Sequence, residues 1–218
     1  MSVASGRTKE QRLPGSGRAA AFSDAVFAIS ITLLVLDLRV PDHEPGELWS
    51  ALAGRWPVYV AFAVSFLYVG VLWLNHHAML RHVTHVDLGF QWLNLALLFG
   101  IVIIPFPTSV IADTFAADTA DASDQRVAVL FYSLLAALMS FTWLGVWSYL
   151  SRHPELLDEL TDTGWARAQL PRPIVGMVLF TLGGLAGFFL TPVVGLIAIV
   201  AMIVYHAATS EGVRRRRG

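Results

Sequence analysis

Long apolar segments recur along most of this sequence, and they limit how the chain can fold more than any other feature. Hydrophobic residues make up 56% of the 218 residues and charged residues only 14%, which is more apolar surface than one soluble core buries. A membrane-spanning helix needs about 20 mostly apolar residues. The pattern therefore predicts an all-α polytopic membrane protein with six transmembrane helices, at residues 19–38, 57–77, 89–108, 127–150, 173–191 and 193–210.

The placement of charged residues predicts how these helices are oriented. Basic residues gather in the tails and the even-numbered loops: Arg7, Lys9, Arg12, Arg18, Arg81, Arg152, Arg167, Arg172 and Arg214 to Arg217. The opposite loops are mainly acidic. Because cytoplasmic loops are enriched in Lys and Arg, both termini should be cytoplasmic. Residues 1–17 and 212–218 are then basic cytoplasmic tails on either side of a membrane domain at 18–211.

The first predicted helix carries a carboxylate, Asp24, inside its apolar stretch. An ionised carboxylate in hydrocarbon costs several kcal/mol unless it has a partner, so this residue indicates a function or a buried polar network. At about 100° per residue, Ile29, Leu33 and Leu36 lie within about 40° of one line, while Asp24 projects about 140° away and Thr32 about 60° to the side. The polar residues of this helix therefore have different environments.

Depth suggests which groups accompany Asp24. The second helix runs inward and ends with Trp73, Asn75 and His77, and the third helix places Asn94 about six residues inside the membrane. Ser23, Asp24, Asn75, His77 and Asn94 could form one polar network that clamps the first helix to its neighbours. Ser23, Ser30 and Thr32 could instead bond to carbonyl groups of their own helix.

Two further patterns concern packing and anchoring. Gly183 and Gly187 have a small-xxx-small spacing in the fifth helix, which allows close approach of another helix. Trp143 and Trp147 lie near the inner end of the fourth helix and are typical of an interfacial aromatic belt.

The first helix also has a specific motif. The motif begins with Arg18 and Phe22-Ser23-Asp24 and continues with Ala-Val-Phe-Ala-Ile-Ser-Ile-Thr-Leu-Leu-Val-Leu-Asp. This segment resembles the signature first helix of the transmembrane protein 175 family of potassium channels. The segments Trp73-Leu-Asn75-His76-His77 and Trp92-Leu-Asn94-Leu also resemble that family. With a single repeat of six helices, the chain is similar to its prokaryotic members.

The resemblance implies a homotetramer in a prokaryotic cell membrane, with the first helix of each subunit around a central pore. Ile29, Leu33 and Leu36 match the family's hydrophobic constriction, and Thr32, with Ser30 as a weaker candidate, matches its selectivity layer. The network that holds the pore helix is then Arg18, Phe22, Ser23, Asp24, Trp73, Asn75, His77 and Asn94.

These expectations define a function without a cofactor or metal site, with potassium as the permeant ion. The sequence has no Thr-Val-Gly-Tyr-Gly segment, so a filter of stacked backbone carbonyls is not available and selectivity should come from side chains. Hydroxyl oxygens without formal charge predict modest potassium-over-sodium selectivity. Expected partners are other copies of the chain, membrane lipids and potassium ions, but no nucleic acid.

One alternative is a proton-coupled or cation secondary transporter, which Asp24 and the histidines from His76 to His85 would serve. The chain lacks the paired broken helices expected of many carriers. A membrane enzyme is a further alternative, but the sequence contains no G-x-S-x-G, H-E-x-x-H or P-loop pattern.

Overall fold

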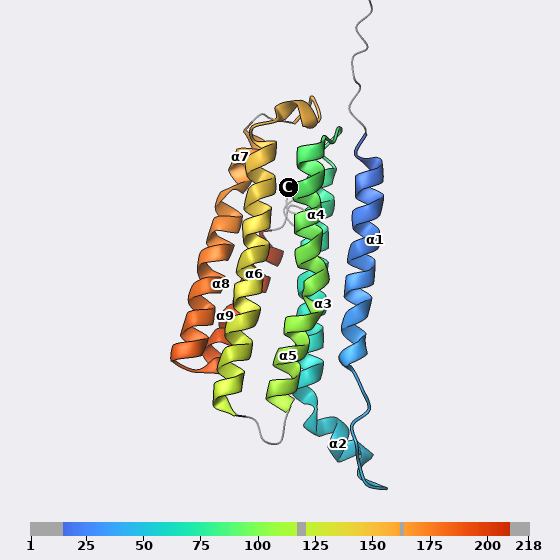
Figure 1. The fold of residues 1–218 in the computed structure, drawn as a ribbon, viewed down its shortest axis with the longest axis vertical. Helices are drawn as coiled ribbons and strands as arrows, with labels where there is room; N and C mark the ends of the chain where they lie inside the picture. Colours follow the sequence, from blue (N-terminus) through green and yellow to red (C-terminus); the bar gives the residue numbers. More distant parts are fainter. Residues whose placement is uncertain (1–14, 117–120, 162–163, 210–218) are drawn as a thin grey trace, which may run out of the picture.

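The chain forms a bundle of long helices that run side by side (Figure 1). The computed structural model describes residues 15–116, 121–161 and 164–209. Its α-helices are α1 Gly17–Leu33, α2 Leu48–Gly54, α3 Trp56–Leu80, α4 Leu88–Ile103, α5 Pro105–Ala116, α6 Ala122–Leu150, α7 Trp165–Gln169, α8 Pro171–Phe189 and α9 Pro192–Ala208. Short 3₁₀ helices follow α1 at Leu34–Asp37 and α6 at Pro154–Leu156.

The predicted all-α membrane architecture is confirmed. Five helical segments of the described residues have the length and composition to cross a membrane: Gly17–Asp37, Trp56–Leu80, Leu88–Ala116, Ala122–Leu150 and Trp165–Phe189. The sixth predicted helix corresponds to α9, which is apolar but has only 17 residues. At a rise of about 1.5 Å per residue it is about 25 Å long, slightly less than a hydrocarbon core of about 30 Å.

The helices differ from the predicted segments mainly at their ends. The third segment, predicted at 89–108, continues to Ala116 and is divided into α4 and α5 at Pro105. The division occurs there because proline has no backbone N–H with which to continue the hydrogen bonds of α4. The fourth begins at Ala122, where the Asp121 carboxylate accepts a hydrogen bond from the Ser123 N–H at 2.9 Å. The short helices α2 and α7 were not predicted. Most of both predicted tails, 1–17 and 212–218, lies outside the described residues.

The start of α4 is fixed to the end of α6 by Asp87. Its Oδ1 accepts a hydrogen bond from the Phe90 N–H at 2.7 Å, and its Oδ2 accepts one from the Tyr149 hydroxyl at 2.5 Å. Partial burial acts to raise the pKa of Asp87, but these two hydrogen bonds outweigh it and hold the pKa below its usual value. This cap sets the position of α4, which carries Asn94 toward α1.

The α8–α9 hairpin depends on glycine. A Cβ atom built on Gly183 would lie 2.6 Å from the Ala198 Cβ, and one built on Gly195 would lie 2.9 Å from the Gly187 Cα and 2.3 Å from the Val129 Cγ1. These distances are too short for real Cβ contacts. The packing role predicted for Gly183 and Gly187 is thus confirmed, and α9 supplies the matching small residues.

Gly195→Ala should therefore destabilise the bundle, because the added methyl group has to separate α9 from both α8 and α6. Overpacking of this kind costs about 1–3 kcal/mol, which would lower the midpoint of thermal unfolding of the purified protein by several degrees. Gly54→Ala is the matched control, because a Cβ on Gly54 meets nothing within 4 Å. Equal melting midpoints for the two variants would contradict this account of the hairpin.

Candidate functional site

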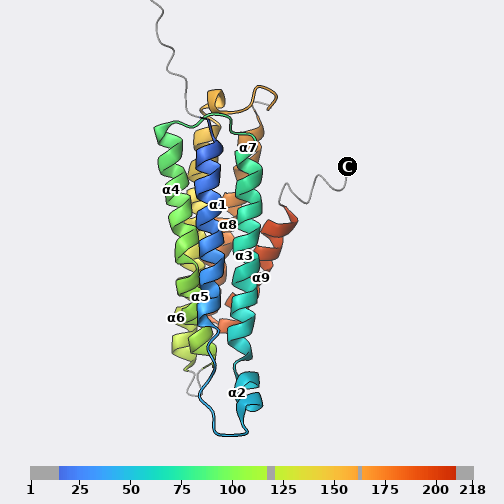
Figure 2. The same ribbon diagram turned by 90° about the vertical axis from the view of Figure 1, so that its right-hand side faces the viewer.

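Helix α1 lies at one side of the bundle, and its main neighbours among the long helices of the described residues are α3 and α4 (Figures 1 and 2). In Figure 2 it runs between these two helices along most of its length. One face of α1 is thus covered by its own subunit, and the opposite face is left open. The two faces carry different chemistry.

The covered face consists of Ser23, Phe27 and Ser30, and Leu34 at the start of the 3₁₀ turn continues it; none of the four is more than 2% exposed. They follow one another at intervals of three and four residues, as one side of a helix requires. Both serine hydroxyls donate to carbonyl oxygens of their own helix, Ser23 to Ala19 at 2.8 Å and Ser30 to Val26 at 2.9 Å. The local bonding considered for these serines in the sequence is therefore present.

A chain of hydrogen bonds joins this face to α4 and α3. The Asn94 amide Nδ2 donates to the Ser23 hydroxyl oxygen at 3.0 Å, and the Asn94 Oδ1 accepts from the His76 Nε2 at 2.8 Å. Because Oδ1 can only accept, the proton of a neutral His76 is on Nε2. All three side chains are at most 5% exposed, so removing Asn94 leaves the His76 Nε2 buried without a partner and leaves the Ser23 hydroxyl only its bond to the Ala19 carbonyl.

Asp24 forms a second connection, at the edge of the covered face. Its Oδ1 accepts a hydrogen bond from the Trp73 indole Nε1 at 2.9 Å. Trp73 is 38% exposed, so this bond is far less buried than the Ser23–Asn94–His76 chain. Asp24 has a partner, as an intramembrane carboxylate requires, but it does not take part in the buried chain itself.

Two residues predicted for the network, His77 and Asn75, lie elsewhere. His77 is exposed and its ring packs on Trp73, with 5.6 Å between ring centroids, while the buried position belongs to His76. Asn75 turns to the other side of α3 and lines a cavity with α6, α8 and α9. Successive helical residues differ by about 100°, so only one of three neighbours can face α1. The prediction was wrong in choosing His77 and Asn75 over His76.

Arg18 and Phe22 also lie outside the hydrogen-bonded chain. Both are exposed, and Phe22 keeps 53% of its surface. Within the described parts of the chain, the Arg18 side chain forms no hydrogen bond or ion pair. In a single subunit these two residues therefore lie outside the polar network that was expected to include them.

The open face of α1 carries the apolar stripe. Ile29 is 59% exposed, Leu33 39% and Leu36 62%, although α1 ends at Leu33 and Leu36 belongs to the 3₁₀ turn that follows. Thr32 is exposed beside them, and its hydroxyl donates to the Ile29 carbonyl oxygen at 2.8 Å. Ser30, the weaker selectivity candidate, is fully buried on the opposite face, so its predicted contact with a permeating ion does not fit this structure.

The end of the stripe is held by a contact that sequence reasoning did not identify. The Ser109 hydroxyl of α5 donates to the Asp37 Oδ1 at 3.1 Å, just where the 3₁₀ turn ends. Ser109 lies 72 residues from Asp37, and no local pattern links the two. The open face of α1 is thus fixed at both ends, by Ser23 and by Asp37.

The sequence and the fold of this chain are similar to those of known proteins. The family model described as the endosomal/lysosomal potassium channel TMEM175 matches residues 18–105, which include all of α1 except Gly17, and all of α3 and α4. A protein named potassium channel from Streptomyces collinus is 41% identical over 168 residues, which cover 77% of this chain and 80% of the relative. The chain belongs to the TMEM175 family.

Two further matches come from Chamaesiphon minutus. A protein named potassium channel is 37% identical over 150 residues, covering 67% of this chain and 71% of the relative. The crystal structure of a lysosomal potassium-selective channel TMEM175 homolog has a TM-score of 0.76 and 30% identity, and the match covers 90% of this chain and 98% of that one. The family resemblance predicted from the first helix is confirmed, and the family consists of channels rather than enzymes.

Asn94→Ala tests whether the buried chain holds α1. The variant leaves the Ser23 hydroxyl and the His76 Nε2 buried without this partner, so the free energy of unfolding should fall by about 2–4 kcal/mol. Gln91→Ala, an exposed amide one turn earlier in α4, is the control and should change it by less than about 0.5 kcal/mol. Thermal unfolding of both purified variants measures the difference. A stable Asn94→Ala protein would show that the chain is dispensable.

Proposed function

We propose that this TMEM175-family chain is a potassium-permeable channel in a prokaryotic cell membrane, with six membrane helices per subunit and four subunits around one pore. The open face of α1 lines that pore. The observation that carries the proposal is the division of α1 into a polar, clamped face and an open face of Ile29, Thr32, Leu33 and Leu36. The family match and the names of the bacterial relatives support potassium as the ion.

Small residues beside the stripe favour a pore over a face covered only by lipid. Ala21, Ala25 and Ala28 are exposed on the same side of α1. Small side chains allow helices to approach closely in a membrane. Four copies of α1 could then meet at these alanines while the larger Ile29 and Leu33 side chains project toward the axis.

The mechanism follows from the apolar stripe. A ring of four isoleucine or leucine side chains excludes water from a narrow pore, and a potassium ion cannot shed its hydration shell there without replacement ligands. The closed state is therefore a dry constriction, and opening requires the ring to widen. The Ser23–Asn94–His76 chain keeps the back of α1 fixed while the four open faces set the pore radius.

Thr32 supplies the polar layer. Its hydroxyl proton is used in the bond to the Ile29 carbonyl, so the oxygen lone pairs remain to face the pore. An oxygen without formal charge binds potassium weakly enough to release it, which predicts modest selectivity over sodium.

The basic tails and loops orient the subunit with both termini in the cytoplasm. The 3₁₀ turn that ends at Asp37 then lies at the external mouth. Asp37 and the acidic loops on that side could concentrate cations there, an effect that added salt would weaken.

Reconstitution into planar bilayers tests the function. With potassium on one side and sodium on the other, we expect unitary currents whose reversal potential lies toward the potassium equilibrium potential. Proton-linked flux of fixed stoichiometry without unitary currents would instead support the secondary transporter.

Leu33→Ala tests the constriction. Removing this side chain widens the apolar ring and lets water enter, so the basal open probability should rise several-fold in single-channel recordings. Leu182→Ala is the control, because Leu182 is also exposed but lies on α8, across the bundle from α1. An unchanged open probability in both Leu33→Ala and Ile29→Ala would refute the assignment of the constriction.

Thr32→Ala tests the polar layer. Loss of the hydroxyl oxygens should shift the reversal potential toward the sodium one, whereas Thr32→Ser should keep it near the wild-type value. Thr181→Ala serves as a threonine control, since the Thr181 hydroxyl makes the same kind of bond, to Met177, on α8. If the potassium-over-sodium permeability ratio is the same in Thr32→Ala as in the wild type, Thr32 has no part in selectivity.

A further inference from the structure

A partly open cavity lies away from α1, between α3, α6, α8 and α9. Its position follows from the unequal lengths of the last two helices. A Cβ on Gly176 would lie 3.0 Å from the His206 Nε2, so His206 is level with Gly176, and α9 ends two residues later at Ala208. The start of α8 and all of α7 extend beyond that point, and the space beside them is not filled by α9.

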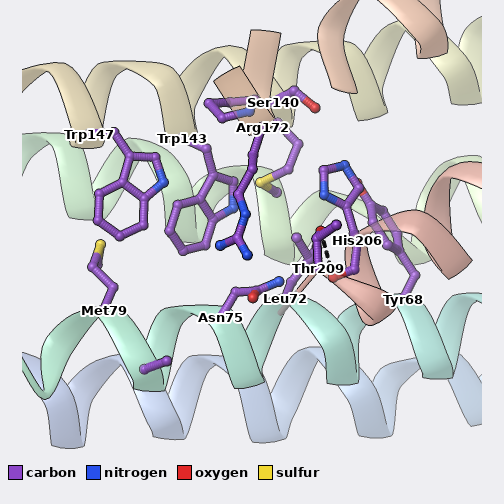
Figure 3. Close-up of a pocket in the computed structure, with 13 residues that line it drawn as sticks. Tyr68, Leu72, Asn75, Met79, Ser140, Trp143, Trp147, Arg172, His206 and Thr209 are labelled. Carbon is purple, nitrogen blue, oxygen red and sulfur yellow. Dashed lines mark hydrogen bonds between the residues drawn. The ribbon is translucent and has the colours of Figure 1, made fainter. Parts of the chain in front are cut away.

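The walls of this cavity combine apolar side chains with hydrogen-bond donors. Figure 3 shows the Arg172 side chain running from α8 toward Asn75, with the Trp143 ring on one side and the His206 ring on the other. The apolar part of the wall includes Leu72. Among the described residues that line the cavity there is no Asp or Glu.

The Arg172 Nη1 donates to the Gln169 Oε1 at 2.7 Å, whereas other polar groups of the wall have no hydrogen-bond partner among the residues that the structure describes. Trp143 is only 7% exposed, yet its indole Nε1 is buried without a partner in the described part of the chain. In the same range, no hydrogen bond of the Asn75 amide or of the His206 ring nitrogens is present. A buried N–H without an acceptor costs about 1–3 kcal/mol, so an acceptor that enters the cavity would be stabilised.

The depth of the cavity relates it to lipid headgroups. Helix α3 has 25 residues and is about 37 Å long, against a hydrocarbon core of about 30 Å. Asn75 lies five residues before its end at Leu80, which is about 7 Å along the axis and therefore close to the boundary between hydrocarbon and headgroups. The positive charge of Arg172 favours an anionic acceptor at this level.

We propose that this cavity binds the phosphate of an anionic phospholipid from the adjacent leaflet. The phosphate oxygens accept hydrogen bonds from the Trp143 indole, the Asn75 amide and the Arg172 guanidinium, and the acyl chains extend along the apolar outer surface. The cavity volume of about 50 Å³ restricts what enters to the polar end of the molecule. Trp143 and Trp147, expected to anchor in the interface, are instead turned inward and buried.

Native mass spectrometry of the full-length protein in detergent tests the proposal, with phosphatidylglycerol, phosphatidylcholine and inorganic phosphate as separate probes. We expect phosphatidylglycerol to bind about tenfold more tightly than phosphatidylcholine, and inorganic phosphate to leave lipid occupancy unchanged. Equal affinity for the two lipids would overturn the proposal. Displacement of phosphatidylglycerol by millimolar inorganic phosphate would show a free-anion site and would overturn the lipid assignment.

Two variants test whether the lipid binds in this cavity. Trp143→Phe keeps the ring but removes the N–H, and Arg172→Gln removes the charge, so each should weaken phosphatidylglycerol binding about tenfold. The controls Trp92→Phe and Arg81→Gln change exposed residues outside the cavity and should bind as the wild type does. Elution volume on size exclusion verifies folding, and if Arg172→Gln does not fold, Trp143→Phe decides. Wild-type affinity in a folded Trp143→Phe protein would contradict the site.

Discussion

The hydrogen-bond chain from Ser23 through Asn94 to His76 is the interaction on which the rest of the structure depends. Helix α1 lies at the side of the bundle, where lipid tails are as apolar as its own side chains, so hydrophobicity alone gives it no reason to prefer α3 and α4. The bond from Asn94 to Ser23 provides that preference, because the buried Asn94 amide N–H loses its acceptor when α1 moves away. It also fixes the rotation of α1 about its axis, and that rotation decides which residues face outward.

From this one constraint the two faces of α1 follow. With Ser23, Phe27, Ser30 and Leu34 turned inward, Ile29, Leu33 and Leu36 must turn outward, since they lie on the opposite side of the same helix. Ser23 and Asp24 of this chain thus connect α1 to α4 and α3. The ion-conducting role that we propose belongs to the open face of α1, whose side chains do not fix the helix to its neighbours.

Much of this could be predicted from the sequence, because apolar length and helical periodicity are local properties. They give the membrane helices, the stripe on α1 and the inward direction of Ser23. The errors concern properties that depend on neighbouring helices. His76 and His77 differ by about 100° in direction, and only the position of α4 shows that His76 meets Asn94. Ser30 could have been excluded from the sequence, since it lies about 100° from Ile29 and near Ser23 on the same helical wheel. The Asp37–Ser109 contact and the inward turn of Trp143 arise from packing between distant segments and have no local signal.

The claim that the open face of α1 meets water inside a pore, rather than lipid, can be tested directly because the chain contains no cysteine. Single cysteines at Thr32 and Leu36 would be exposed to a charged, membrane-impermeant thiol reagent during bilayer recording, with Leu182→Cys on α8 and the buried Ser30→Cys as controls. A thiol in hydrocarbon stays protonated and unreactive, whereas one in water forms thiolate. If the open face lines the pore, the reagent reduces the current through Thr32→Cys and Leu36→Cys channels and leaves the current through both controls unchanged. Unmodified current at Thr32 and Leu36 in conducting channels would contradict this claim.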